Sequence, residues 1–87
     1  MPTFLSVFFG IVIAMYWDDH APPHFHALYG DDEVLIAIKT LDVMRGKIPR
    51  RALSLVLEWA QENRDALLKD WDLCQRNQMP LPIPPLQ

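Results

Sequence analysis

The chain has 87 residues, a length that fits one domain with a modest hydrophobic core. Hydrophobic residues make up 51% of it and the mean hydropathy is +0.02, which favours a packed globule and excludes a disordered chain. The net charge of −3 disfavours generic nucleic-acid binding, because nucleic acids are polyanions.

The charges are unevenly distributed along the chain. Residues 1–38 contain no Lys or Arg and carry a charge of −5, whereas residues 39–51 carry +4 and residues 52–87 carry −2. The basic segment is suited to a phosphate or an acidic partner, or to the acidic first part of the same chain. Cys74 is the single cysteine, which excludes an intrachain disulfide, so we expect a cytoplasmic protein.

An almost wholly apolar run occupies residues 4–17. It lacks the positively charged start of a signal peptide and is shorter than the ~20 residues that span a bilayer. We therefore expect a soluble protein with no membrane contact. The β-branched and aromatic residues of 7–17 predict one buried strand, with Gly10 at a bulge or at a close approach of the backbone.

Two further strands are predicted over residues 24–29 and 33–39, joined by a hairpin turn of three or so residues at 30–32. A short fourth strand is predicted over 40–44, and a turn at 45–47 follows it. This register pairs His26 with Ile36.

Because side chains alternate along a strand, the same register turns His24 and His26 toward the core. Phe25 and Tyr29 then lie on the opposite, more mixed face of the sheet, where we expect them to contact a partner.

A long amphipathic helix is predicted from Pro49 to Arg76, because apolar residues recur at three- and four-residue steps. Arg64 interrupts this stripe, so a bend or break is expected near Asn63. An unbroken helix would be ~42 Å long and would extend beyond a small sheet. An extending apolar stripe implies a self-association or partner surface. The expected contact residues on it are Leu67, Leu68 and Trp71.

The fold class predicted from these elements is α+β: an antiparallel meander of three or four strands packed against one long, possibly bent, C-terminal helix. This single domain spans residues 1–78. Residues 79–87 contain four prolines and form an extended tail, which is either disordered or lies across the domain. In the second case its contacts are Leu81, Ile83 and Leu86.

All three histidines of the chain fall within seven residues, at His20, His24 and His26. Imidazole is the commonest transition-metal ligand and transfers protons near neutral pH. One reading is therefore a divalent transition-metal site made by the three histidines, with Asp19 or Asp18 as a further ligand or orienting group. A second is a metal-free site in which His24 and His26 are the catalytic acid and base. A third is structural, with each ring hydrogen-bonded at the edge of the core.

The basic segment meets the start of the predicted helix at Arg50 and Arg51. Free backbone N–H groups at a helix N-terminus favour anions, so these two arginines are candidate phosphate-binding residues. The alternative is a solvated turn whose arginines face the acidic half of the chain.

Five motifs cover most of the chain apart from the tail: GIVIAMY at 10–16, DH at 19–20, PPHFHALYG at 22–30, PRRAL at 49–53 and LEWA at 57–60. With these motifs the sequence resembles the bacterial family catalogued as domain of unknown function 4160. Proteins of such families are small and are often encoded beside another short protein. This gene arrangement resembles that of toxin–antitoxin pairs. The resemblance implies an interaction partner and supplies no activity or cofactor.

The function expected first is therefore a protein-interaction component of a toxin–antitoxin-like pair, binding a separately encoded small protein or a second copy of itself. The alternative is a metal- or histidine-dependent nuclease or other phosphoester hydrolase, in which the histidine cluster is the active site and RNA is a substrate.

Overall fold

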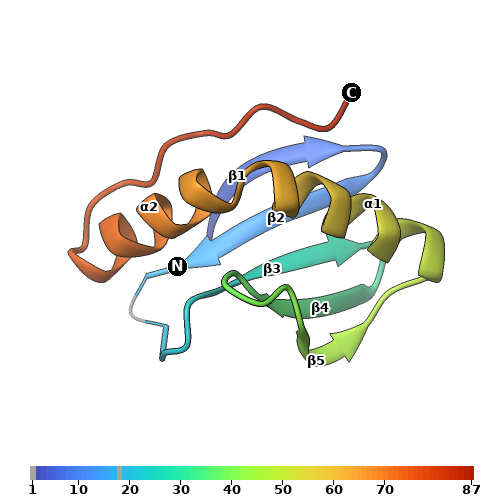
Figure 1. The fold of residues 1–87 in the computed structure, drawn as a ribbon, viewed down its shortest axis with the longest axis horizontal. Helices are drawn as coiled ribbons and strands as arrows, with labels where there is room; N and C mark the ends of the chain where they lie inside the picture. Colours follow the sequence, from blue (N-terminus) through green and yellow to red (C-terminus); the bar gives the residue numbers. More distant parts are fainter. Residues whose placement is uncertain (1, 18) are drawn as a thin grey trace.

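Five antiparallel strands and two helices form the domain (Figure 1). The computed structural model describes residues 2–17 and 19–87. Its elements are β1 (Pro2–Phe8), β2 (Ile11–Tyr16), β3 (His24–Tyr29), β4 (Asp32–Ala37), β5 (Val43–Lys47), α1 (Arg50–Glu62) and α2 (Arg64–Gln75). The strands lie in sequential order in one sheet. The α+β class is confirmed, but the prediction of three or four strands against one long helix is wrong.

The apolar opening of the chain forms a hairpin, so the single strand predicted over residues 7–17 is wrong. β1 and β2 flank a two-residue turn at Phe9 and Gly10, whose φ angles are +50° and +78°. Positive φ at both central residues is the type I′ pattern, which matches the twist of paired strands. Gly10 adopts it freely, whereas a bulky residue such as Phe9 does so rarely. No polar residue marks this turn, which is why the sequence pattern concealed it.

The turn between β3 and β4 is shorter than predicted. Tyr29 pairs with Asp32, so only Gly30 and Asp31 form the turn. Gly30 has a φ of +60°, which glycine adopts without the steric cost that a Cβ atom imposes. The two-residue turn shifts the pairing of the strands by one residue from the predicted register.

This shift exchanges the two faces of β3. His26 pairs with Leu35, and a one-residue slip moves every side chain of a strand to the other face. Phe25 therefore lies beneath α1, fully buried, with its ring 6.0 Å from that of Trp59. The prediction that His24 and His26 share the core-facing side of the sheet with Ile36 is therefore wrong. His24, at the start of β3, still lies close to a helix, because its ring is 5.2 Å from that of Trp71 on α2. They belong to the side of the sheet opposite Phe25, which we call the outer face.

The basic residues 45–47, predicted as a turn, lie inside β5, and the strand predicted over 40–44 begins only at Val43. Gly46 pairs with Val34 and has a φ of +78°. A Cβ atom at this position would overlap the carbonyl oxygen of Glu33. Gly46 therefore permits the close approach of β5 to β4.

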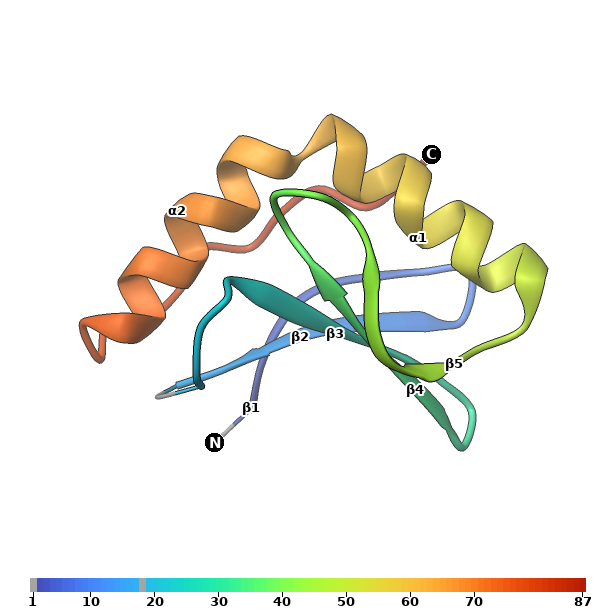
Figure 2. The ribbon, with the colours of Figure 1, turned by 60° about the horizontal axis from the view of Figure 1, so that its bottom comes forward.

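The two helices form an arch over one face of the sheet, and the break between them falls at Asn63 (Figure 2). Asn63 Nδ2 donates a hydrogen bond to the carbonyl oxygen of Trp59 at 2.8 Å. Arg64 Nε donates to the carbonyl oxygen of Ile38 at 3.2 Å, in the loop after β4. Arg64 interrupts the apolar stripe because it makes this polar contact. Within residues 2–17 and 19–87, neither helix is long and apolar enough to cross a membrane.

The proline-rich C-terminal segment lies across the domain beside β1 and the helices (Figure 1). Ile83 donates its backbone N–H to the carbonyl oxygen of Leu5 at 2.9 Å. Trp59 Nε1 donates to the carbonyl oxygen of Pro84 at 2.9 Å. The side chains of Ile83 and Leu86 are buried as predicted, whereas that of Leu81 is 52% exposed. The segment thus completes the hydrophobic core rather than extending into solvent.

Candidate metal centre

Two imidazoles and a carboxylate meet where β2 ends and β3 begins. His24 and His26 are two residues apart on β3, so both project from the outer face. Asp19 lies in the loop that joins β2 to β3. Gln75 Nε2, at the end of α2, donates to the backbone carbonyl oxygen of Asp19 at 3.0 Å and ties this loop to the helix.

Asp19 Oδ2 lies between the two imidazoles. It is 3.0 Å from His24 Nε2 and 3.1 Å from His26 Nε2. The ligand atoms offered by the three residues all lie within 4.8 Å of one another. The other ring nitrogens also have oxygen partners: His24 Nδ1 lies 2.8 Å from the carbonyl oxygen of Pro22, and His26 Nδ1 lies 2.8 Å from Glu33 Oε2.

Four ring nitrogens thus face oxygens, and all of these oxygens are acceptors when the carboxylates are ionised. The carbonyl oxygen of Pro22 can only accept, so the proton of a neutral His24 is on Nδ1. Its Nε2 lone pair then points at Asp19 Oδ2. A neutral His26 likewise has one proton for two carboxylates. Two neutral imidazoles supply two of the four protons that this arrangement requires.

With both carboxylates ionised, two states remove this deficit. In the first, both imidazoles carry a second proton and become cations. Each ring would then donate to a carboxylate: His24 and His26 to Asp19, and His26 also to Glu33. In the second, a metal cation lies between the two Nε2 atoms and Asp19 Oδ2. Each Nδ1–H then donates outward to Pro22 or Glu33, as the second nitrogen of a metal-bound histidine commonly does.

Aromatic side chains hold the two imidazoles in place. The ring of Tyr16 lies 4.4 Å from that of His26, and the ring of Trp71 lies 5.2 Å from that of His24. Such packing restricts ring rotation and favours a preorganised ligand set.

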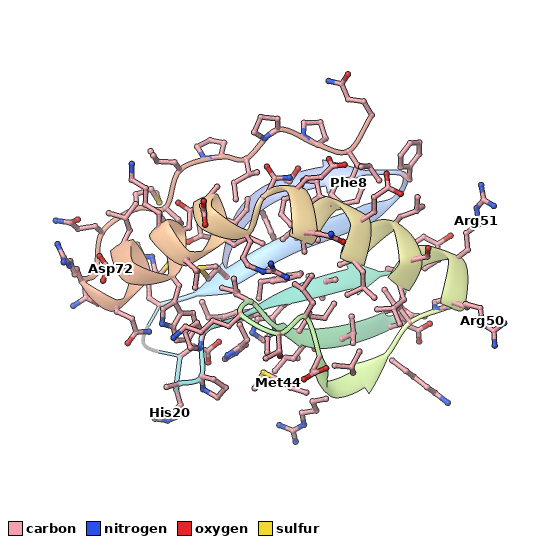
Figure 3. The ribbon with its side chains drawn as sticks, viewed as in Figure 1. Phe8, His20, Met44, Arg50, Arg51 and Asp72 are labelled. Carbon is pink, nitrogen blue, oxygen red and sulfur yellow. The ribbon has the colours of Figure 1, made fainter. Side chains whose placement is uncertain are left out.

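The sequence identified His24, His26 and Asp19 of this group. It did not identify Glu33, which orients His26. Glu33 contacts His26 only because the β3–β4 turn has two residues, and the predicted register hid this contact. His20 is exposed on the β2–β3 loop and is not part of the group (Figure 3). Asp18, the other predicted carboxylate, lies outside the described residues.

The candidate phosphate-binding residues lie elsewhere. Arg50 and Arg51 begin α1 at the end of the molecule opposite the loop of His20 (Figure 3). The structure does not bring them together with the histidine cluster.

The five candidate interface residues are mostly internal. Phe25 and Leu67 are fully buried, and Trp71 is 8% exposed. Leu68 is half-buried, and Tyr29 is 38% exposed beside the start of α1. The predicted free stripe on the helix is wrong, because the break at the middle of the helical region folds α2 against the domain.

Two further titratable residues, Asp70 and Cys74, are buried on α2. Burial raises the pKa of Asp70, while the hydrogen bond from the Leu81 N–H to Asp70 Oδ1 at 2.9 Å partly opposes the shift. Asp70 Oδ2 is buried without a hydrogen-bond partner in the described residues. Burial, reinforced by the charge of Asp70, also raises the pKa of Cys74 to about 11, so this cysteine is a thiol at neutral pH.

Comparison with known proteins places the chain in a family. The family model described as Domain of unknown function (DUF4160) matches residues 10–72, which include Asp19, both clustered histidines and Glu33. No curated protein and no solved structure matches the chain. The chain belongs to the DUF4160 family.

Proposed function

We propose that this protein binds a divalent transition-metal ion through Asp19, His24 and His26. The observation that supports the proposal is that Asp19 Oδ2 is the common partner of two imidazole nitrogens, at 3.0 and 3.1 Å, while the other nitrogen of each ring faces an acceptor oxygen. A metal cation at this position would interact with both Nε2 lone pairs and with the Asp19 carboxylate, so neither Nε2 atom would need a proton.

The spacing of the ligand atoms supports the same proposal. Two atoms bound at 2.0–2.1 Å to one ion, at angles between octahedral and tetrahedral, lie about 2.9 to 3.4 Å apart. The nitrogen–oxygen distances of 3.0 and 3.1 Å fall in this range. Imidazole with one carboxylate suits zinc, iron, nickel or copper better than calcium or magnesium.

Three protein ligands leave at least one coordination position for water. Catalytic zinc sites have this composition, whereas structural zinc sites have four protein ligands. The side chain of Asp19 is 30% exposed, so solvent reaches the group. These features support the metal-dependent alternative read from the sequence. Membership of a toxin–antitoxin-like pair stays a prediction from the family resemblance.

Titration of the chelator-treated, full-length protein with Zn²⁺ in a calorimeter tests the proposal. We expect one ion per chain, and loss of binding in His24→Ala and His26→Ala. His20→Ala is the matched control, because it removes an imidazole from the same loop and leaves the three ligands intact. Circular dichroism checks that each variant is folded.

Absence of binding by the wild-type protein would overturn the proposal, and so would an equal loss in all three variants. The histidines would then be structural, hydrogen-bonded to Pro22, Asp19 and Glu33.

A further inference from the structure

The outer face carries two basic side chains in line with the proposed metal ligands. Paired residues of an antiparallel sheet project from the same face. His26 pairs with Leu35, and Leu35 pairs with Arg45 on β5. Arg45 therefore lies on the outer face, two strands from His26, at a backbone separation of roughly 10 Å.

A lysine on β5 lies on the outer face for the same reason. Glu33, whose carboxylate contacts His26 Nδ1, pairs with Lys47. Arg45 and Lys47 are both exposed. Among residues 2–17 and 19–87, neither forms an ion pair within 4.0 Å. Their charges are available to a ligand above the outer face.

The net charge of the outer face indicates the charge that the ligand should carry. A divalent ion would offset the charges of Asp19 and Glu33, and Arg45 and Lys47 would then leave the face with a net charge of +2. The remaining coordination positions of the ion accept an anionic oxygen. The planar guanidinium of Arg45 matches the oxygens of a phosphate group, and the ammonium of Lys47 adds a point charge.

We propose that the metal ion and these two residues together bind a phosphate dianion, as free phosphate or as the terminal group of a phosphate monoester. This inference rests on the proposed metal site. It replaces Arg50 and Arg51, which lie at the far end of the molecule (Figure 3), with Arg45 and Lys47 as the phosphate-binding residues.

Arg50 and Arg51 supply a matched control. They are exposed, like Arg45 and Lys47, and replacing either pair by alanine changes the net charge equally. The test compares the double variants R45A/K47A and R50A/R51A. The single variants R45Q and K47Q keep the test conclusive if the first double variant unfolds.

The measurement has two arms on the full-length protein. The first titrates each variant with Zn²⁺ alone, and we expect unchanged stoichiometry in both. The second titrates the zinc-loaded proteins with inorganic phosphate, with phenyl phosphate as the monoester and with acetate as a monoanionic control. We expect R45A/K47A to lose affinity for both phosphates by about tenfold or more, and R50A/R51A to match the wild type. Acetate should bind more weakly than either phosphate.

The two probes separate the sources of the phosphate group. Tighter binding of phenyl phosphate supports a monoester ligand, and tighter binding of inorganic phosphate supports the free anion. The inference is overturned if both double variants bind phosphate equally, or if acetate competes as well as phosphate, while zinc binding is normal. Failure of the wild-type protein to bind zinc is a different result, and it removes the metal site as well.

Discussion

Gln75 and Asp19 are 56 positions apart in the chain, yet Gln75 Nε2 donates to the backbone carbonyl oxygen of Asp19 at 3.0 Å. This hydrogen bond joins the end of α2 to the loop that carries the proposed carboxylate ligand. The C-terminal helix therefore positions a group that belongs to the β2–β3 loop.

Replacement of Gln75 by alanine should weaken zinc binding without removing a ligand. The bond is exposed and neutral, so its loss should raise the Kd about threefold, with unchanged stoichiometry. Zinc titration measures this effect. Gln61→Ala, an exposed glutamine on α1, is the control and should bind like the wild type. Equal affinities of the two variants would show that the bond does not position the loop.

Glu33 should matter more, because it orients a proposed ligand directly. Its Oε2 lies 2.8 Å from His26 Nδ1. Loss of such an orienting partner commonly weakens metal binding by about 10- to 100-fold, and we expect a decrease of this size for Glu33→Ala. Asp32→Ala removes the adjacent acidic side chain and serves as the control. If both variants bind zinc with the same affinity, the role assigned to Glu33 is wrong.

Gly46 and Gly30 have positive φ angles but different surroundings. A Cβ atom at Gly46 would overlap the carbonyl oxygen of Glu33, whereas nothing lies within 4 Å of one at Gly30. Gly30→Ala should lower the free energy of unfolding by about 1 kcal/mol, the cost of the backbone conformation alone. Gly46→Ala should lower it by about 3 kcal/mol or more, because β5 must also move away from β4.

Urea unfolding of the two glycine variants measures the difference. Equal destabilisation would contradict the close approach of β5 to β4. Gly46 lies between Arg45 and Lys47, so a shift of β5 would also move these two residues. Replacement of Gly46 should therefore weaken phosphate binding more than zinc binding.

Asp70 should make stability depend on pH. Burial raises its pKa in the folded state above the ordinary value of 3.8, so over the window between the two values the folded chain holds a proton that the unfolded chain has lost. Stability contributed by this group is therefore complete below pH 3.8 and decreases as the pH rises through the raised pKa. Asp70→Asn cannot ionise and keeps an oxygen acceptor for the Leu81 N–H.

Urea unfolding of the wild type and Asp70→Asn across this pH range tests the prediction. The variant should gain stability relative to the wild type as the pH rises, and the difference should level off once Asp70 is ionised in the folded state. A difference that is independent of pH would contradict the raised pKa.

The sequence allowed β3 to be predicted with correct bounds, because Pro23 precedes the strand and Gly30 follows it. It also identified the neighbourhood of Asp19, His24 and His26, since three chemically distinctive side chains lie close together in the chain. Local signals of this kind are carried by residue type and spacing alone.

The faces of the sheet could not be predicted in the same way. The β3–β4 register depends on one residue of turn length, and both readings place apolar residues on each face. The β1–β2 turn was missed because Phe9 adopts a backbone conformation that bulky residues rarely adopt. The contact of Glu33 with His26, and the placement of Arg45 on the outer face, both follow from that register.

The most direct test of the metal site is anomalous diffraction at the zinc absorption edge from crystals of the zinc-loaded protein. The proposed metal site predicts one strong peak bounded by His24 Nε2, His26 Nε2 and an Asp19 carboxylate oxygen, at about 2.0 to 2.2 Å from each. Density with no peak at that position, and with both imidazoles still hydrogen-bonded to Asp19, would contradict it.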